Sequence, residues 1–455
     1  MKKNEIIQLN ITAMSSEGSG IGRYEGLAVF VPMTAIGDIC KVKILKVKSN
    51  CAFGKAEEII TPSEDRIQPD CPAFSKCGGC VYRHISYGAE CKIKKQRVED
   101  AIRRIGGVDL SANEICFGEA DRYRNKAQYP VAEDYTVGFY RNHSHDIVAS
   151  EDCALQPQIF KTASDIFTDF IRKNKLSVYN EETGRGLVRH LYLRLAEKTN
   201  ELMVAVVING NELPNSGELI EALRGEIPSL KTVVLNINKE KTNVILGTKC
   251  LNLYGDGHIF DILCGVKVRI NPLSFYQVNR NMAERLYEKA KEYAKPKGKR
   301  VLDLYCGAGT IGLSMAKEAR EIIGVEIIPE AVKDAEFNAE NNRIENARFI
   351  CGDAAAAAVT LKNEGIRPDV VILDPPRKGC SEELLYIVAN DFNPERVVYV
   401  SCDPATLARD IKILSSLGFE LKEYTPFDLF PRTHHVETVA CLTRNNELQP
   451  DGCMN

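Results

Sequence analysis

The sequence predicts a multi-domain protein: an N-terminal β-barrel, a central α+β domain with a cysteine metal site, and a C-terminal Rossmann-like α/β domain. Short segments that alternate apolar and polar residues, separated by glycines, fill residues 1–60. Three closely spaced cysteines follow within residues 71–80. Near residue 300, an apolar strand, a glycine turn and a helix start occur in succession, as in nucleotide-type sites. We therefore expect domains at residues 1–60, 61–270 and 271–455.

The composition is typical of a protein from a reducing compartment. The 455 residues suffice for roughly two to four domains. No apolar run is long enough to span a bilayer, and no apolar segment follows the lysines at the start. The 16 cysteines are therefore expected to serve metal binding or chemistry rather than disulfides. We expect a cytoplasmic protein, with no membrane partner and no obligate protein partner.

The net charge of −3 argues against a protein that coats nucleic acid non-specifically. The charge is unevenly distributed, however. Residues 92–104 contain six basic side chains against two acidic ones. This run has two interpretations: a basic face that holds phosphates, or a solvated face of a helix over residues 86–105 that ends at Gly106 and Gly107.

The N-terminal segments at residues 6–11, 27–31, 39–47 and 54–60 read as strands of a small barrel. Residues 20–32, with Gly20, Gly22 and Gly26, resemble the TRAM domain, an OB-like barrel of RNA-modifying enzymes. Four lysines accompany the third of these strands. In a regular strand Lys41 and Lys43 share one face and Lys46 and Lys48 the other, unless a bulge shifts the register. The lysine face is interpreted either as an RNA contact or as a solvated barrel surface.

Cys71, Cys77 and Cys80 lie close together, and Gly78 and Gly79 let the backbone wrap tightly between the last two. Cysteines this close favour a metal site, for which we choose Cys153 as the fourth ligand. Zinc and an iron–sulfur cluster both accept four thiolates. Only one CxxC pair is present, whereas zinc ribbons usually have two, so the cluster is favoured.

Residues 122–126 are basic, with an aromatic side chain among them. Arg122, Arg124 and Lys126 suit contacts with phosphates, and Tyr123 suits base stacking. The alternative interpretation is an exposed basic loop without a ligand. We expect Arg122, Arg124 and Lys126 to contact RNA.

The glycine turn at residues 303–312 predicts a nucleotide-type site. The pattern Asp303-x-x-Cys306-Gly307-x-Gly309 resembles the loop that binds S-adenosylmethionine (SAM) more than a dinucleotide loop. Glu326 lies 23 residues after Asp303 (326 minus 303) and closes the next strand, a position from which its carboxylate can reach the ribose diol of a nucleotide. Asp353, which comes after the following strand, suits a contact with the adenine. The expected cofactor-binding residues include Tyr305, Thr310, Glu326 and Asp353.

Two further strands end in chemically distinctive turns. Residues 370–373 lead into Asp374-Pro375-Pro376-Arg377, a rigid turn whose two prolines have no backbone N–H to donate. Amine-methylating enzymes usually have an aromatic residue after such prolines, so Arg377 makes amine methylation a weaker hypothesis. Residues 397–400 form an apolar strand that ends at Cys402, a position where open α/β sheets bind ligands.

These motifs together resemble the RNA uracil-5-methyltransferase family over nearly the whole chain. The matching stretches are residues 20–32, the cysteines with Cys153, residues 274–279, the glycine turn, residues 374–377, residues 401–404 and residues 435–437. The resemblance implies SAM as methyl donor and a 4Fe-4S cluster on the four cysteines. The TRAM-like barrel and the cluster together resemble the branch that modifies 23S ribosomal RNA. Asp403 departs from this pattern, which often has asparagine there.

The resemblance also implies roles for individual residues. Cys402 would add to carbon 6 of uracil, and Glu437 would remove the proton from carbon 5. Phe275 would stack on a uracil that has left the RNA stack, while Gln277 and Asp374 would contact the base or the donor. Two alternatives remain open: the same reaction on transfer RNA, or a non-catalytic RNA-binding or redox protein with an inactive methyltransferase fold.

Overall fold

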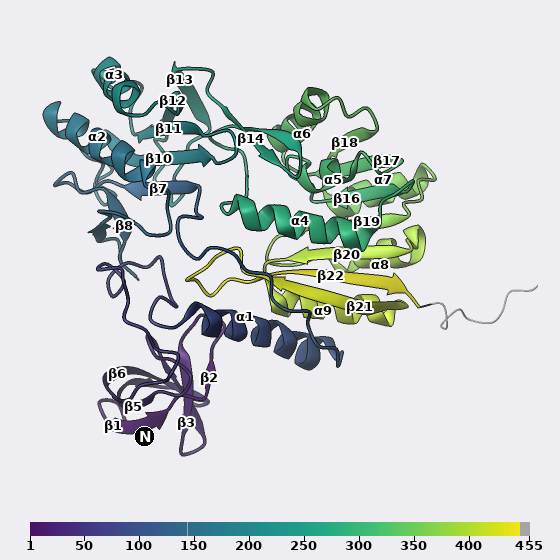
Figure 1. The fold of residues 1–455 in the computed structure, drawn as a ribbon, viewed down its shortest axis with the longest axis horizontal. Helices are drawn as coiled ribbons and strands as arrows, with labels where there is room; N and C mark the ends of the chain where they lie inside the picture. Colours follow the sequence, from purple (N-terminus) through teal and green to yellow (C-terminus); the bar gives the residue numbers. More distant parts are fainter. Residues whose placement is uncertain (143, 446–455) are drawn as a thin grey trace, which may run out of the picture.

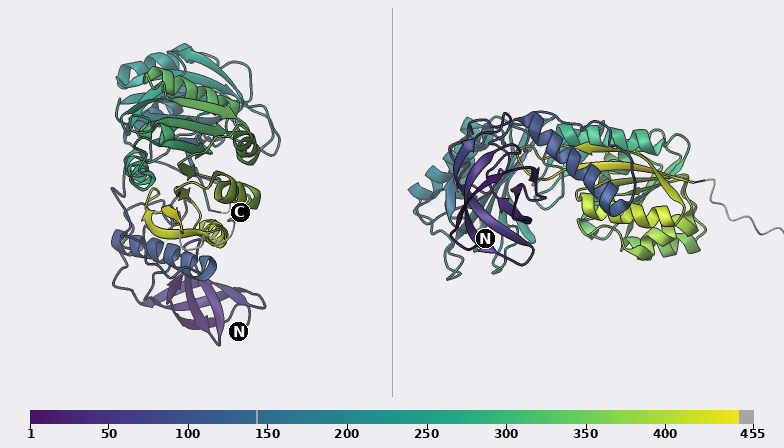
Figure 2. Two further views of the ribbon diagram at one scale, coloured as in Figure 1. Left: turned by 90° about the vertical axis from the view of Figure 1, so that its right-hand side faces the viewer. Right: turned by 90° about the horizontal axis from the view of Figure 1, so that it is seen from below.

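The computed structural model describes residues 1–142 and 144–445, which build three larger sheets in succession along the chain (Figure 1). The N-terminal sheet lies at one end of an elongated molecule, as Figure 2 shows. Helix α1 (Tyr87–Ala101) separates it from the C-terminal sheet. Among the described residues, no helix has the length and apolarity needed to cross a bilayer.

The N-terminal sheet has the strand order β1-β5-β6-β4-β3-β2. Its strands are β1 (Ile6–Asn10), β2 (Ala13–Met14), β3 (Gly20–Tyr24), β4 (Leu27–Val31), β5 (Ile39–Val47) and β6 (Cys51–Thr61). The sheet curls so far that β3 packs on β1. A Cβ atom on Gly22 would lie 2.4 Å from the Asn10 carbonyl oxygen, so this crossing requires glycine.

A register shift between Ile44 and Lys46 interrupts the pairing of β5 with β6. The extra residue reverses the alternation of faces beyond that point. Lys41, Lys46 and Lys48 are consequently all exposed, while Val42 and Ile44 are buried in the sheet core. The bulge that the sequence left open is therefore present, and three of the four lysines are exposed, while Lys43 is half-buried.

The central sheet has the order β13-β12-β11-β10-β7, with only β11 and β12 parallel. Its strands are β7 (Lys126–Pro130), β10 (Val188–Ala196), β11 (Glu201–Ile208), β12 (Leu230–Ile237) and β13 (Lys249–Tyr254). Helices α2 (Ile159–Lys173) and α3 (Ser216–Glu226) cover one face through Phe160, Phe167 and Leu219. Two hairpins complete this part: β8 (Gly138–Tyr140) with β9 (Ile147–Ala149), and β14 (Ile259–Leu263) with β15 (Val266–Ile270).

The C-terminal sheet has the order β18-β17-β16-β19-β20-β22-β21, in which the strands from β18 to β20 are parallel. The strands are β16 (Arg300–Leu304), β17 (Glu321–Glu326), β18 (Ala347–Cys351), β19 (Val370–Leu373), β20 (Arg396–Ser401), β21 (Phe419–Phe427) and β22 (Glu437–Arg444). The strand order reverses at β16, so a crevice is expected at the carboxyl ends of β16 and β19.

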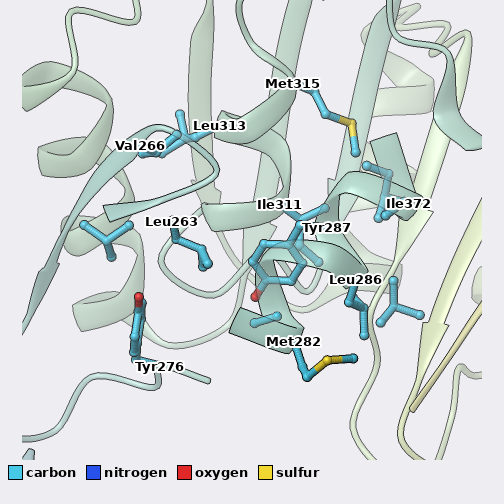
Figure 3. Close-up of a cluster of buried hydrophobic side chains, with 14 of the residues drawn as sticks. Leu263, Val266, Tyr276, Met282, Leu286, Tyr287, Ile311, Leu313, Met315 and Ile372 are labelled. Atoms are coloured by element: carbon cyan, nitrogen blue, oxygen red, sulfur yellow. The ribbon is translucent and has the colours of Figure 1, made fainter. Parts of the chain in front are cut away.

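Helices cover both faces of this sheet. One face packs on α4 (Arg280–Ala294), α5 (Thr310–Met315) and α6 (Pro329–Asn341), and Figure 3 shows Leu286, Ile311 and Ile372 in this layer. The other face packs on α1, α7 (Ala354–Asn363), α8 (Glu382–Tyr386) and α9 (Pro404–Ser416). Short π-helical segments, Ile102–Gly106 and Ile387–Phe392, extend α1 and α8.

Helix α1 lies in the sequence range predicted for the central domain but packs on the C-terminal sheet layer. Val98 and Ile102 are fully buried beside Leu407 and Ile411 of α9. The helix itself and its end at Gly106 and Gly107 agree with the predicted pattern. The exact domain boundaries at residues 60 and 270 stay a prediction.

Candidate active site

A cavity of about 1530 Å³ opens at the carboxyl ends of β16, β19 and β20. Its wall brings together the glycine turn after β16, the Asp374 turn, the Cys402 thiol and the segment around Phe275. All nine residues predicted to bind SAM or the base or to act in catalysis line this cavity: Phe275, Gln277, Tyr305, Thr310, Glu326, Asp353, Asp374, Cys402 and Glu437.

The glycine turn has the backbone that its composition predicts. Gly307 and Gly309 have φ angles of 55° and 78°, in the left-handed region where glycine carries no steric cost. Behind the turn, the fully buried Asp303 accepts a hydrogen bond from the Gly312 N–H at 2.9 Å. Burial raises the pKa of Asp303 to about 8, so this carboxyl is a structural brace and largely protonated at neutral pH.

Glu326 and Asp353 both lie at the rim of the cavity and both bind backbone groups. The Glu326 carboxylate accepts hydrogen bonds from Gly307 N–H at 3.1 Å and Ile328 N–H at 2.9 Å. Asp353 caps α7 by accepting the Ala355 N–H at 3.0 Å. Glu326 is therefore not a free surface acid: it fixes the glycine turn, and its remaining lone pairs are available to a ligand.

Asp374 faces the cavity from the end of β19, beyond the glycine turn. Removal from solvent raises the pKa of Asp374 to about 7. Close by, the Thr310 hydroxyl donates to the Tyr287 hydroxyl at 3.3 Å. The Gln277 side chain also contacts this tyrosine hydroxyl, and Figure 3 shows the Tyr287 ring beside Ile311. The polar floor of the cavity is thus built from α4, α5 and β19.

Strand pairing brings Cys402 and Glu437 together. β22 runs antiparallel to β20 with Ser401 opposite Thr438, so the first residue of β22 falls beside the residue that follows β20. Burial, and then repulsion by the Glu437 carboxylate, raise the pKa of the Cys402 thiol to about 11, and Arg377 opposes this rise. Burial and repulsion by Asp374 raise the pKa of Glu437 to about 8.

The turn after β20 leaves the thiol free. Asp403 caps α9 by accepting N–H groups of Ala405 and Thr406 at 2.9 Å, and Pro404 occupies the first turn of that helix. The Ser401 hydroxyl bonds to Asp403 backbone groups. Both neighbours of Cys402 are therefore engaged in the turn, while its side chain lines the cavity.

The segment at residues 274–278 is fixed on both sides of Phe275. The Ser274 hydroxyl donates to Asp334 at 2.7 Å, and the Tyr276 hydroxyl donates to Asp261 at 3.0 Å. Asn125 donates to the Gln277 carbonyl at 3.1 Å. Phe275 itself is 75% exposed, so its ring projects into the cavity from a rigid backbone. The sequence did not single out Asp334, Asp261 or Asn125, because each is recognisable only by a partner far away in the chain.

Comparison with known proteins places this cavity in a family. Residues 264–445 match the family model of tRNA (Uracil-5-)-methyltransferase, and residues 2–56 match that of the TRAM domain. A Clostridium tetani protein named as an RNA methyltransferase is 41% identical over 448 residues, which cover 97% of each chain. The chain belongs to the RNA uracil-5-methyltransferase family.

Two further relatives support the same assignment. A Staphylococcus epidermidis protein, also named as an RNA methyltransferase, is 41% identical over 98% of this chain and 99% of its own length. The Pyrococcus abyssi tRNA (uracil-54, C5)-methyltransferase, solved with S-adenosyl-L-homocysteine, is 26% identical with a TM-score of 0.77. The structural match covers 96% of this methyltransferase and 100% of the Pyrococcus abyssi chain.

The three basic residues predicted to contact RNA have different environments in this methyltransferase. Arg122 donates to both Asp152 oxygens at 2.6 and 2.7 Å and to the Gln156 carbonyl at 2.9 Å, so its guanidinium is already occupied. Arg124 lines the cavity. Burial lowers the pKa of Lys126 to about 8. Arg124 is therefore the best placed of the three, and the RNA contacts stay a prediction.

The four predicted metal ligands, Cys71, Cys77, Cys80 and Cys153, are free thiols that line one wall of the same cavity. Burial raises the pKa of Cys80 to about 12, and mutual repulsion among these sulfurs adds to the rise. Over residues 1–142 and 144–445, however, no three His, Cys, Asp or Glu side chains are close enough to hold one metal ion. These four thiols are chemically suited to a metal centre and lie on one cavity wall, but the part of the chain that the structure describes contains no preformed site for a single ion.

Proposed function

We propose that this enzyme transfers a methyl group from SAM to carbon 5 of uridine in RNA through a covalent adduct on Cys402. One observation carries the proposal: the register of β20 and β22 sets the Cys402 thiol beside the Glu437 carboxyl in one cavity. Nucleophile and base are the two groups that this chemistry needs, because carbon 5 of uracil is a poor nucleophile until a thiolate adds to carbon 6.

The steps balance with these two side chains. The Cys402 thiolate forms a bond to carbon 6, and the electron pair of the ring double bond moves into an enolate. Carbon 5 then attacks the methyl group, and the bond from methyl to sulfonium breaks to release S-adenosylhomocysteine. Glu437 takes the proton from carbon 5; the double bond re-forms as the bond between sulfur and carbon 6 breaks.

The electrostatics of the cavity suit these roles. The pKa of Glu437, about 8, lies near neutral pH, where a general base is most effective. The Arg377 guanidinium lowers the pKa of both Cys402 and Glu437 and so favours their ionised forms. Phe275, with its exposed ring, offers a stacking surface for a uracil swung out of the RNA.

The donor would occupy the other part of the cavity. Glu326 is the proposed partner of the ribose diol and Asp353 that of the adenine. Tyr305, which follows β16, and Thr310, the first residue of α5, would line the donor site beside them. Asp374 and Gln277 would contact the donor or the base. The positive φ angles of Tyr305 and Gly307 support a close approach of the backbone to this ligand.

We propose 23S ribosomal RNA as the substrate, because the chain combines a TRAM domain with the set of four cysteines. Transfer RNA is the alternative, and one observation favours it. The Pyrococcus abyssi enzyme is named for transfer RNA and matches 96% of this chain, so the match extends beyond the methyltransferase domain. The N-terminal domain is thus not in itself a mark of ribosomal substrates.

We also propose that Cys71, Cys77, Cys80 and Cys153 hold a 4Fe-4S cluster. Four free thiols on one cavity wall support it, and a cluster of four irons needs wider spacing of its ligands than a single ion does. Such a cluster would crosslink the 71–80 segment to the Cys153 segment, and no step of the methyl transfer requires it. Iron and sulfide analysis of the purified protein tests this assignment, with Cys80→Ser as the variant expected to lose iron.

Methyl transfer from labelled SAM to ribosomal RNA and transfer RNA transcripts, followed by nucleoside analysis, tests the function. 5-Methyluridine in ribosomal RNA supports the full proposal, and label in transfer RNA alone overturns the substrate. Cys402→Ala should abolish both label and adduct, whereas Cys351→Ala, at an exposed thiol outside the cavity, should change neither. Absence of label from both RNAs would favour a non-catalytic RNA-binding protein.

A further inference from the structure

The loop that leads to Glu437 is held in place by residues from a distant part of the chain. This 428–436 loop joins β21 to β22 and contributes Phe430, Thr433 and His435 to the cavity wall. Glu437 follows it directly, as the first residue of β22. On the β20 side, strand pairing ends one residue later, at Thr438, and Glu437 is paired only with Phe427, the last residue of β21. Because the 428–436 loop connects these two paired residues, its shape influences how Glu437 is oriented at the end of the strand.

Three carbonyl groups of the 428–436 loop accept hydrogen bonds from residues before, within and after α1. The Arg432 carbonyl accepts the Val81 and Tyr82 N–H groups at 2.6 and 3.1 Å. The Pro431 carbonyl accepts the Tyr123 hydroxyl at 2.9 Å, and the His434 carbonyl accepts Arg97 at 2.8 Å.

A buried group of four charges lies where α1 meets this loop. Lys94 Nζ lies 2.7 Å from Glu90 Oε1, 2.7 Å from Asp428 Oδ1 and 3.2 Å from the Phe430 carbonyl. The three charged side chains are at most 1% exposed. Arg432 completes the group: its N–H donates to Glu90 at 2.7 Å, and its guanidinium lies 3.7 Å from the same carboxylate.

The two cations and two anions of this cluster balance, which allows them to be buried together. Its geometry is demanding, because Glu90 and Lys94 on α1 must meet Asp428 and Arg432 of the loop, and Arg432 has a φ of 69°, a strained value for a residue with a side chain. Neither interpretation of the basic run at residues 92–104 applies to Lys94, which faces neither RNA nor solvent. Its buried position instead serves the loop.

We infer that Lys94 is a positioning residue for catalysis: its ion pairs with Glu90 and Asp428 fix the 428–436 loop so that Glu437 faces Cys402. This inference rests on the proposed function, since it assumes that Glu437 is the base. Lys94 touches no reacting atom, and Cys402, which follows β20, is held independently by the turn before α9. Loss of Lys94 should therefore impair the step that uses Glu437 more than the steps that use Cys402.

The test is Lys94→Met, with Lys95→Met as the matched control. Lys95 is the next residue on α1, and its partner Glu114 is exposed. Lys94→Met should lower kcat on the order of 10²-fold, the cost of a misplacement of about 1 Å, with the KM for RNA little changed. Its signature is accumulation of protein linked to methylated RNA, because addition and methyl transfer proceed while proton removal fails. Lys95→Met should turn over normally.

Tyr123→Phe keeps the inference testable if Lys94→Met does not fold, because it removes a single hydroxyl from the Pro431 carbonyl. It should accumulate the same adduct to a smaller extent. Normal kcat per folded molecule and no adduct, in Lys94→Met or failing that in Tyr123→Phe, would overturn the inference. Failure of the proposed function looks different: Glu437→Gln would then trap no adduct either.

Discussion

Replacement of Glu437 by glutamine separates two effects that this carboxyl has on the active site. As an anion beside Cys402, it raises the pKa of the thiol and makes the nucleophile weaker. As the proposed base, it is needed to release the methylated product. Glu437→Gln should therefore make the thiol of the free enzyme more reactive and yet stop turnover at the adduct.

The size of the first effect follows from the pKa. At pH 9, about half of a thiol with the ordinary pKa of 9.0 is thiolate, against about one part in a hundred for the value of about 11 at Cys402. Glu437, with a pKa of about 8, is ionised between pH 9 and 10. Burial is the larger cause of the rise at Cys402, so removal of the carboxylate should raise the thiolate fraction by roughly threefold to tenfold.

The assay is the rate of Cys402 alkylation by iodoacetamide between pH 9 and 10, measured by mass spectrometry of the labelled peptide. Glu330→Gln is the control, because Glu330 is an exposed carboxylate in the wall of the same cavity. An unchanged alkylation rate in Glu437→Gln would contradict the electrostatic contact. Multiple turnover of RNA by this variant, without a gel-shifted adduct, would refute the assignment of Glu437 as base.

Three further outcomes are expected. Phe275→Ala should lower kcat/KM for RNA by about tenfold to 100-fold, the value of one stacked base, and leave SAM affinity in a calorimetric titration unchanged; an equal loss in Leu273→Ala would argue against stacking. Asp303, whose folded pKa is about 8, favours the folded state below pH 4, and this contribution is lost as pH rises to 8. Urea unfolding should accordingly show a smaller fall in stability between pH 5 and 8 for Asp303→Asn than for the wild type. Replacing Lys46 and Lys48 by glutamine should reduce the salt dependence of RNA binding by about one unit of slope per lost phosphate contact, and an unchanged slope would mean that the lysine face is only solvated.

Features set by neighbours in sequence could be predicted well. The strand, glycine turn and helix start around Gly307 follow from local backbone preference, and the structure has them in that order. Helix α1 likewise follows from its apolar spacing and its glycine end. Spacing, however, identifies the buried face of a helix and not the surface that covers it. Helix α1 was thus assigned to the central domain, although Val98 packs on α9.

Features set by long-range partners could not be predicted. Lys94 reads as one more exposed lysine in a basic run, because its partner Asp428 lies 334 residues away. Arg122 reads as a phosphate ligand until Asp152 is found to occupy it. The functional residues of the cavity were named in advance only because the family resemblance supplied roles that spacing alone does not give. Asp334, which holds Ser274, has no such motif and was missed.

The charges around Cys402 indicate when the site becomes reactive. In the free enzyme the raised pKa values of Cys402, Glu437 and Asp374 all favour the protonated, uncharged forms. A thiol in this state resists oxidation and adventitious alkylation, because the thiolate is the reactive species. The sulfonium of the proposed donor carries a positive charge, and its arrival beside Asp374 would favour ionisation of all three groups. The energetic cost of burying these acids would thereby delay formation of the nucleophile until a methyl donor is present to use it.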